Sequence, residues 1–394
     1  MENGIDYDVI VGGGSVSGLL AAREIASKGH SILVLEEHDE IGLPEKCDGL
    51  VSNRAMSSLG IVAKTKMVQN VIKGTILHSP AGKEIEIDAS KMGVIVLNRA
   101  EFDKEIARIA EERGVILEVS RGVMGVSKNN GHMVINTNHG DLSCKYFVDA
   151  MGCSSLMKQR RSEILQAAKY VIHGDWFRRE MVELYFDQTA TPGFFTWVIP
   201  IDDETAKVGV AGRGINSFKV LDAFVKKMKG SIVKKIAAPI SIGGPIDRFI
   251  DDHVIHVGDA AGQTKPTTAG GIYSGGVGGI LAGQSISLAL EKEDDIHLKN
   301  YENAWRSLFG KEFTLTLRGR KIFEKFENVH FEELLNQLAS SKDVLSVLSS
   351  ESDFDFHSMA LLKALGMRGI MGMVKTVASA ELTNIISSLN AKSE

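Results

Sequence analysis

The first stretch of the chain constrains its fold more than any other part of the sequence. Residues 7–11 read as a buried strand, residues 12–18 are the turn Gly-Gly-Gly-Ser-Val-Ser-Gly, and residues 19–26 have a helical pattern closed by Gly29. A second strand over residues 31–35 ends at Glu36. This is the βαβ fingerprint, in which a helix N-terminus faces a pyrophosphate and an acid about 20 residues on binds ribose hydroxyls. We therefore predict a parallel sheet that binds a dinucleotide.

One position departs from the fingerprint. Its third glycine falls at Ser17, with Gly18 beside it. Serine is small enough to keep helix and strand close, so the motif is weakened rather than lost, and the alternative of a plain βα turn leaves the second strand and Glu36 unexplained. The residues expected around the pyrophosphate are Gly12, Gly14, Ser15, Val16 and Ser17, and those expected at the ribose are Glu36 and Glu37.

A second nucleotide signal lies at residues 257–271. A short strand over residues 254–257 ends in Gly258-Asp259, and a loop then leads into a glycine-rich helix. The Asp259 carboxylate can accept hydrogen bonds from ribityl or ribose hydroxyls, glycines let a ligand approach the backbone, and a helix N-terminus favours negative charge. Two such signals predict FAD held along its length. The expected contacts here are Gly258, Asp259, Lys265, Pro266, Gly270, Gly271 and Ile272.

The stretch from Pro266 to Leu290 carries no charge and is long enough to span a bilayer. It is also rich in glycine and hydroxyl side chains. Gly271, Gly275, Gly279 and Gly283 recur every four residues and would line one face of a helix. We therefore expect a buried, closely packed helix rather than a membrane span.

A helix start is predicted at Asn98-Arg99-Ala100-Glu101, which has the form of a capping box. Arg99 stands at the end of the helix where a cation is unfavourable, which indicates a phosphate partner. A solvent-exposed arginine is the alternative. Residues 146–149 read as a further strand that ends near the nucleotide.

Composition limits the functional classes. A net charge of −5 and a pI near 6.2 argue against a nucleic-acid binder. The three cysteines, Cys47, Cys144 and Cys153, have no metal-ligand spacing, so no metal site is expected, and their odd number suits a reducing cytoplasm. No signal peptide is expected before the first strand. We expect residues 1–72, 91–160 and 248–290 to bind FAD, β-rich residues 73–90 and 161–247 to bind substrate, and residues 291–394 to be helical.

Together these motifs resemble the geranylgeranyl reductase family of flavoproteins, in its archaeal membrane-lipid branch. The resemblance covers roughly residues 5–320. Besides the nucleotide signals it includes residues 41–52 (Ile-Gly-Leu-Pro-Glu-Lys-Cys-Asp-Gly-Leu-Val-Ser), Arg99 with Phe102-Asp103, and residues 192–200 (Pro-Gly-Phe-Phe-Thr-Trp-Val-Ile-Pro). It implies an α/β, α+β composite fold: a Rossmann-like FAD-binding βαβ domain of the hydroxylase-like type, with an inserted antiparallel sheet domain and a helical C-terminus.

The resemblance also implies the reaction, which is saturation of C=C bonds of geranylgeranyl chains on a glycerophospholipid precursor. Cys47, Asp48 and Gly49 would lie near the isoalloxazine as the catalytic group, and Arg99 along the cofactor. Cys47 is open to three interpretations: proton donor, redox partner or packing residue. Cys144 and Cys153 are expected in the core, and His256 and Tyr273 are expected to be structural.

An alkyl chain needs an apolar, water-free tunnel. The aromatic residues expected to form its walls are Tyr185, Phe194, Phe195 and Trp197, with ordinary sheet core as the alternative. Phe194 stands where the family has a second glycine. No second dinucleotide fingerprint is present, so the electron donor is open among NAD(P)H, ferredoxin and another carrier.

Two other functions remain open at this stage: an NAD(P)H- and O2-dependent flavin monooxygenase, and a non-enzymatic prenyl-binding carrier. The Cys47 stretch argues against the first and the FAD signature against the second. The tail from Phe354 suits an amphipathic helix that contacts a membrane surface or packs on the body. We expect a cytoplasmic protein, with peripheral contact to the inner face of the cell membrane as the lipid substrate suggests.

Overall fold

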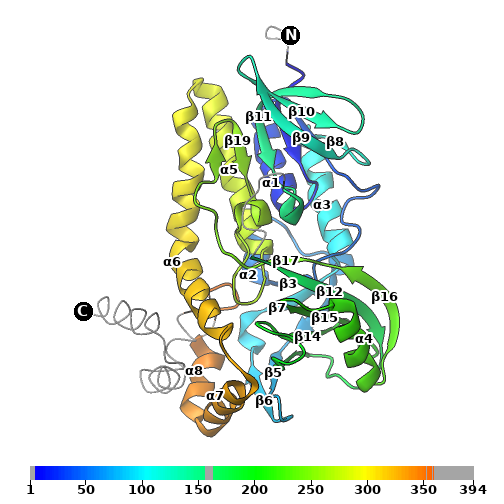
Figure 1. The fold of residues 1–394 in the computed structure, drawn as a ribbon. Coiled ribbons are helices and arrows are strands. Elements are labelled where there is room, and N and C mark those ends of the chain that lie inside the picture. The colour runs from blue at the N-terminus through cyan, green and yellow to red at the C-terminus, as the bar shows by residue number, and fades with distance from the viewer. Residues whose placement is uncertain (1–4, 156–162, 352, 357, 359–394) are drawn as a thin grey trace, which may run out of the picture. The chain divides into compact units, whose positions relative to one another are not determined.

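The computed structural model describes residues 5–155, 163–351, 353–356 and 358 (Figure 1). Its contacts divide the chain into two compact units. The first unit comprises Met1–Gln69, Leu97–Ile164 and Ile240–Phe313, and the second comprises Asn70–Val96, Leu165–Pro239 and Thr314–Glu394. Residues 291–394 are predicted from the sequence to form a separate helical region. In this division, however, the long helix α6 (Lys299–Phe323) begins in the first unit and ends in the second.

The first unit is built on a largely parallel sheet. Strand β1 (Tyr7–Gly12) pairs in parallel with β2 (Ile32–Leu35), as the βαβ fingerprint predicts. It also pairs in parallel with β11 (Leu142–Asp149), which pairs in parallel with β19 (Val254–His256). An antiparallel pair, β9 and β10, extends from β11. The strand order is β18 (Ile250–Asp251), β19 (Val254–His256), β11 (Leu142–Asp149), β1 (Tyr7–Gly12), β2 (Ile32–Leu35) and β8 (Ile116–Glu118), with β10 (His132–Thr137) and β9 (Val123–Asn129) beside β11.

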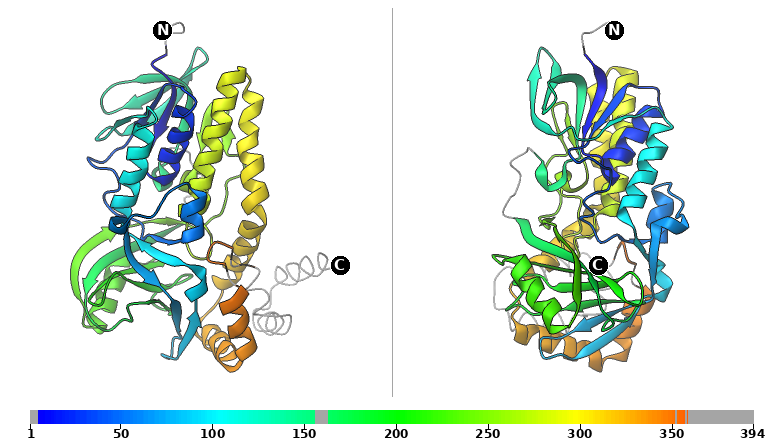
Figure 2. Two further views of the ribbon diagram at one scale, coloured as in Figure 1. Left: turned by 180° about the vertical axis from the view of Figure 1, so that it is seen from behind. Right: turned by 90° about the vertical axis from the view of Figure 1, so that its right-hand side faces the viewer.

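Helices α1 (Val16–Ala26), α3 (Arg99–Glu111) and α5 (Ile272–Lys292) lie together in this unit (Figure 2). Gly279 and Gly283 of α5 face α1: a Cβ on Gly279 would lie 2.1 Å from the Ser17 carbonyl oxygen, and one on Gly283 would lie 2.5 Å from that of Ala21. The expected buried helix is therefore confirmed. Shorter elements are β3 (Leu50–Ser52), α2 (Asn53–Ser58), η1 (Thr65–Met67), η3 (Gly152–Ser154), β17 (Ile240–Ser241), η5 (Gly258–Ala261) and η6 (Asp295–Leu298).

The second unit is built on a mainly antiparallel sheet with a single parallel pairing, β13 with β5. Helix α4 (Ser217–Lys227) covers one face, where it packs on a core that includes Tyr170, Val198 and Val208. The strand order is β16 (Ser231–Ala237), β12 (Ile164–His173), β15 (Thr205–Gly212), β14 (Thr196–Pro200), β13 (Met181–Tyr185), β5 (Gly74–His78) and β6 (Glu84–Asp88). The remaining elements are β4 (Val68–Ile72), η2 (Ser90–Met92), β7 (Val94–Leu97), α7 (Asn328–Ser340) and α8 (Lys342–Glu351).

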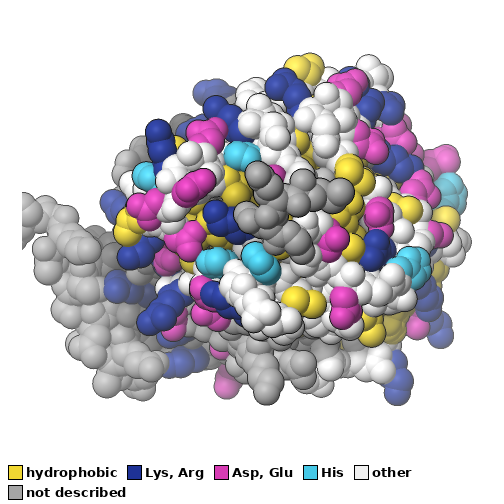
Figure 3. Space-filling model, turned by 90° about the horizontal axis from the view of Figure 1, so that it is seen from above, with side chains coloured by type: hydrophobic (Ala, Val, Ile, Leu, Met, Phe, Trp, Pro, Cys, Tyr) yellow, Lys and Arg dark blue, Asp and Glu magenta, His cyan; other side chains and the backbone are white. Residues whose placement is uncertain are grey.

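Among the described residues no helix combines the length and the hydropathy needed to cross a membrane. The amphipathic tail expected from Phe354 onward lies almost entirely outside the described residues. On the face of the molecule seen in Figure 3, acidic and basic side chains are intermingled.

Candidate cofactor and active site

Two backbone N–H groups of the glycine turn after β1 donate hydrogen bonds to the end of β2 and to the residue that follows it. The Gly13 N–H donates to the Leu35 carbonyl at 2.8 Å, and the Gly14 N–H donates to Glu36 Oε2 at 2.8 Å. A Cβ on Gly14 would lie 2.7 Å from Ile41 Cδ1. Glu36, which is predicted to bind the ribose, accepts this hydrogen bond from the turn, whereas the Glu37 side chain is exposed.

The start of α1 has no protein cap. The N-cap residue Ser15 makes no side-chain cap, and the first turn carries no acidic residue. Its N–H groups and the positive end of its dipole therefore favour an anion such as a pyrophosphate. Val16, the first helical residue, is buried.

The close-contact role of the third glycine belongs to Gly18, one residue later than the sequence motif places it. A Cβ on Gly18 would lie 2.1 Å from the Gly13 carbonyl oxygen, so only glycine fits. Ser17 instead turns its hydroxyl toward the second nucleotide segment, because a Cβ on Gly258 would lie 2.4 Å from Ser17 Oγ. The departure at Ser17 therefore leaves the helix–strand contact intact.

Arg99 is buried, so the exposed alternative is wrong. Its guanidinium donates to both carboxylate oxygens of Asp103 at 2.9 Å and to Ser15 Oγ at 3.2 Å. Burial raises the pKa of Asp103, against the opposing effect of Arg99. The sequence analysis missed this role of Asp103, although the spacing of four residues within a helix was a visible signal.

Only half of the predicted capping box forms at the start of α3. Asn98 Oδ1 accepts from the Glu101 N–H at 3.1 Å. The Glu101 carboxylate pairs with Lys66 at 2.8 Å instead of returning to the cap. The helix start is therefore correct, and the reciprocal hydrogen bond is not made.

The second nucleotide segment places the exposed residue Asp259 beside a helix start that has no side-chain cap. Asp259 accepts a hydrogen bond from the Thr264 hydroxyl, and desolvation raises its pKa while Thr264 and Arg99 act against the rise. A Cβ on Gly271, the N-cap of α5, would lie 3.2 Å from Asp259 Oδ1. Gly271 offers no side-chain cap and the first turn of α5, which starts at buried Ile272, has no acidic residue. Thr264 is a further residue that the sequence analysis missed.

The loop before α5 is tightly closed on itself. The Lys265 N–H donates to the Gly270 carbonyl at 3.0 Å, and the Ala269 N–H donates to the Lys265 carbonyl at 2.9 Å. Ala269 has φ +56°, a left-handed conformation that is uncommon for alanine. Lys265 and Pro266, which are predicted to contact the cofactor, are buried here. Such strain often marks a site whose backbone shape matters.

The Cys47 stretch lies beside Arg99. Cys47 is exposed, and its thiol interacts with the buried Arg99 guanidinium. Gly49 has φ +83°, and a Cβ there would lie 2.5 Å from the Leu97 carbonyl oxygen, so the backbone itself requires glycine. Cys153 is expected in the core but is only half-buried. Its desolvation, with Asp259 adding to it, raises the pKa of its thiol to about 12. Cys144 is fully buried, as expected.

The aromatic residues expected to line a tunnel lie in the second unit. Phe194 and Phe195 stack with ring centroids 4.2 Å apart, and Trp197 meets both edge-on at 6.1 Å. The Trp197 indole lies over Gly209, where a Cβ would be 2.2 Å from Cζ2. Phe186, 5.8 Å from Phe195, adds to this group.

Tyr185 does not belong to this group. In the pairing of β13 with β14, Leu184 lies opposite Trp197 and Tyr185 lies opposite Thr196. Because successive side chains of a strand point to opposite faces, Tyr185 lies on the face covered by α4, where it meets Phe224 at 5.0 Å. The expectation of one wall shared by Tyr185 and Trp197 is therefore wrong.

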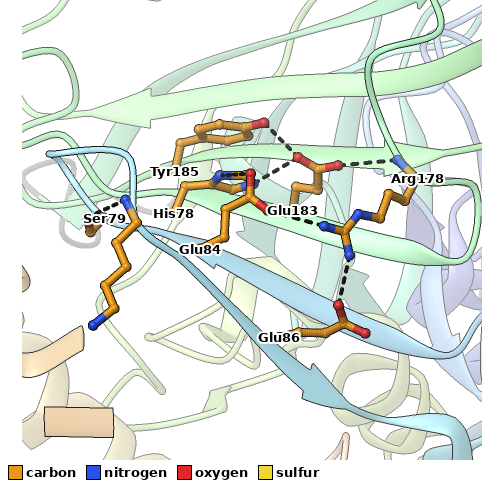
Figure 4. A network of polar contacts seen from close by, with 8 residues as sticks. His78, Ser79, Glu84, Glu86, Arg178, Glu183 and Tyr185 are labelled. Atoms are coloured by element: carbon orange, nitrogen blue, oxygen red, sulfur yellow. Dashed lines mark hydrogen bonds and ion pairs between the residues drawn. The ribbon is translucent and has the colours of Figure 1, made fainter. Parts of the chain in front are cut away.

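Tyr185 instead forms part of a buried polar network (Figure 4). Its ring stacks on His78 at 3.9 Å, and its hydroxyl donates to Glu183 Oε2 at 2.6 Å. His78 Nε2 lies 2.9 Å from the same oxygen. Arg178 closes the outer side by pairing with Glu84 and Glu86. The sequence analysis missed this network, because its members are distant in the chain and carry no motif.

The observed features of the first unit fit FAD. The glycine turn has no room for a Cβ at Gly14, two helix starts lack a side-chain cap, and the Arg99–Asp103 pair is buried while Asp259 is exposed. These features match a dinucleotide with a pyrophosphate, hydroxyls and an anionic end. The profile of the FAD binding domain family matches residues 6–221, so the chain is an FAD-binding flavoprotein.

More specific relatives follow from sequence comparison. The chain is 30% identical over 379 residues to an uncharacterized protein of Methanocaldococcus jannaschii, covering 91% of this chain and 95% of that one. It is 30% identical over 361 residues to the digeranylgeranylglycerophospholipid reductase of the same organism, covering 86% and 92%. The chain therefore belongs to the geranylgeranyl reductase family of flavoproteins.

The fold agrees with a solved structure. A geranylgeranyl bacteriochlorophyll reductase-like protein from Thermoplasma acidophilum superposes with a TM-score of 0.80 at 24% identity, over 94% of this chain and 98% of that one. The expected hydroxylase-like FAD fold is thus confirmed.

Proposed function

We propose that the chain is an FAD-dependent reductase that saturates C=C bonds of geranylgeranyl chains in archaeal-type ether lipid precursors. The observation that carries the proposal is the FAD cradle of the first unit in a chain similar over most of its length to digeranylgeranylglycerophospholipid reductases. Bound FAD, once reduced, supplies hydride to the alkene from its N5 position. Neither the monooxygenase nor the carrier has an observation that favours it.

The proposed roles of the cradle follow from its geometry. The start of α1 with Gly12 and Gly14 holds the pyrophosphate, and Glu36 holds the adenosine ribose. Asp259 accepts hydrogen bonds from ribityl hydroxyls. The start of α5, which has no side-chain cap, would favour the anionic form of the reduced flavin.

We propose that Cys47 supplies the proton that completes the reduction. The Cys47 residue is exposed, and its thiol interacts with the Arg99 guanidinium. General acids contribute roughly 100-fold or more to rate. We expect Cys47→Ala to keep FAD and lose at least this factor in turnover, with Cys47→Ser as the conservative control. Full turnover in Cys47→Ala assigns the residue to packing.

The substrate and electron donor are further parts of the proposal. The isoprenoid chain lies beside the aromatic group of Phe194, Phe195 and Trp197, of which the two phenylalanines are buried. Electrons reach FAD from NAD(P)H, ferredoxin or another carrier that binds transiently. The enzyme acts in the cytoplasm, in contact with the inner face of the membrane that holds its lipid substrate.

An anaerobic half-reaction tests the proposal. The purified yellow protein is reduced with dithionite, and a geranylgeranylated glycerophospholipid is added. We expect the flavin spectrum to return to its oxidised form while the lipid gains two mass units for each double bond, one hydride and one proton. The monooxygenase is indicated if the reduced flavin is not reoxidised by the lipid but is reoxidised by O2 with hydroxylation of a substrate. Protein that binds the prenyl lipid and takes up no FAD indicates the carrier.

A further inference from the structure

One edge of the second unit combines positive charge with exposed apolar side chains. Between Ser217 and Ala237 the chain carries six lysines and a single acid, Asp222. These residues form α4, the turn after it and β16, which is the edge strand of the sheet and contacts α4 (Figure 1). We call this surface the β16–α4 edge; its members are Phe218, Lys226, Lys229, Ile232, Val233, Lys234 and Lys235.

The positive charge of this edge is largely uncompensated. Lys235 pairs with Asp222 at 2.6 Å, which uses the only carboxylate of the segment. Within the described ranges, no ion pair forms at Lys226, Lys229 or Lys234, nor at the neighbouring Lys219 and Lys227. The acidic β14–β15 turn, Asp202–Glu204, borders the edge at the start of β16, and there Asp203 is paired with Arg179.

Apolar side chains stand among these lysines. Val233 is 67% exposed, Ile232 39% and Phe218 38%. The β12–β16 pairing shifts register between Val171 and Ile172, which leaves Val233 without a partner across the strands. Lysines and bulges can protect an edge strand from pairing with another sheet. Protection against such pairing does not explain why Val233 is exposed. It also does not explain the lysines on α4 and on the turn that follows it.

We propose that the β16–α4 edge docks on the surface of an anionic lipid bilayer. A group of four to eight cations with adjacent apolar side chains is the pattern that anionic lipid headgroups attract, because each lysine gains electrostatic energy at the surface and the apolar side chains enter the headgroup layer. The inference rests on the proposed function, since a phospholipid substrate has to be reached in a membrane. It extends that function by naming the surface that makes the contact.

Vesicle co-sedimentation of the full-length, FAD-loaded protein tests the inference without any turnover. Vesicles contain phosphatidylcholine, with or without phosphatidylglycerol. We expect binding only to the anionic vesicles, with a loss of binding as salt is raised. In the triple variant Lys226→Ala, Lys229→Ala, Lys234→Ala we expect binding to weaken roughly 100-fold. The control removes three exposed lysines elsewhere, Lys28→Ala, Lys91→Ala, Lys292→Ala, and should bind as the unmodified protein does.

Two further measurements separate this inference from the reductase activity. Turnover of a detergent-dispersed prenyl lipid should be the same in the triple variant and the unmodified protein, because the edge takes no part in the chemistry. Val233→Asp should weaken vesicle binding at unchanged FAD content. Equal binding to neutral vesicles, equal loss in both triple variants, or self-association through the edge with no vesicle binding would each overturn the inference. If the protein binds vesicles but reduces no lipid, the docking surface is supported and the proposed reaction is rejected.

Discussion

At the scale of the residue, burial decided what the sequence left open. Arg99 had an exposed and a phosphate-facing interpretation, and the structure makes it a buried cation held by Asp103 and Ser15. The third glycine shifted from position 17 to Gly18, because only the backbone geometry reveals which Cβ would meet the Gly13 carbonyl. The Arg99 guanidinium thus lies beside Ser15, the N-cap residue of α1.

The Arg99–Asp103 pair should be essential for stability. Asp103→Asn leaves a buried guanidinium without its carboxylate, and we expect the free energy of unfolding to fall by about 3 kcal/mol. Chemical denaturation of the apoprotein measures this. The exposed pair of Lys66 with Glu101 is the control, and Glu101→Gln should change stability by less than about 1 kcal/mol. Equal effects of the two substitutions would contradict the importance given to burial.

The His78–Glu183–Tyr185 network predicts an acid-sensitive contribution to stability. Burial raises the pKa of Glu183, but hydrogen bonds from His78 and Tyr185 outweigh it and hold the pKa below its usual value. The carboxylate therefore stabilises the fold above the unfolded pKa of about 4.3, and this contribution is lost as pH falls from there through the folded pKa.

Urea unfolding at a series of pH values tests this expectation. The free energy of unfolding should fall more steeply in acid for the unmodified protein than for Glu183→Gln. Glu86→Gln, which alters the exposed pair with Arg178, should keep the steep acid dependence. A steep dependence retained in Glu183→Gln would place the acid-sensitive group elsewhere.

At the scale of the element, the spacing of residues in the sequence predicted which face of a helix is packed. The register between paired strands decided which side chains share a face of the sheet. The four-residue spacing of glycines in α5 predicted a single close-packing face, and that face contacts α1 and Gly258. The alternation along β13 placed Tyr185 and Trp197 on opposite faces. The strands were recognisable in the sequence, but which residues oppose each other depends on pairing across the sheet.

The contact of α5 with α1 gives a prediction with an internal control. A Cβ on Gly279 would lie 2.1 Å from the Ser17 carbonyl oxygen, so Gly279→Ala should destabilise the protein by about 1–3 kcal/mol. In α6, nothing lies within 4 Å of a Cβ on exposed Gly319. Gly319→Ala should therefore stabilise by up to about 1 kcal/mol through helix propensity. Thermal unfolding of both variants measures the difference, and a stabilised Gly279→Ala would contradict the close contact.

At the scale of the whole molecule, the nucleotide segments and the aromatic group lie in different units of the chain. The first contains both nucleotide segments, which lie far apart in the sequence, and the second contains the aromatic group and the β16–α4 edge. Each unit is assembled from three separate segments, so neither can be a contiguous piece of the chain.

Removing FAD should destabilise the molecule by an amount that rises with the logarithm of the FAD concentration. The proposed FAD site joins the glycine turn and the Asp259 segment, which are distant in the chain, so FAD should bind the folded state alone. At 100 times its dissociation constant it should add about 2.7 kcal/mol to stability. Titration of apoprotein with FAD in a thermal unfolding experiment measures this. AMP, which engages only the α1 and Glu36 side, should give a smaller shift. A thermal midpoint independent of FAD would contradict the cradle.

The sequence by itself determined the βαβ start, the second nucleotide segment, the helical glycine face and the family, because these depend on residues close together in the chain. Only the tertiary structure decided the Arg99–Asp103–Ser15 contact, the Thr264 hydrogen bond to Asp259 and the face on which Tyr185 lies. The physical reason is that buried charge, close backbone approach and strand register depend on partners from distant segments. Local periodicity carries no information about those partners.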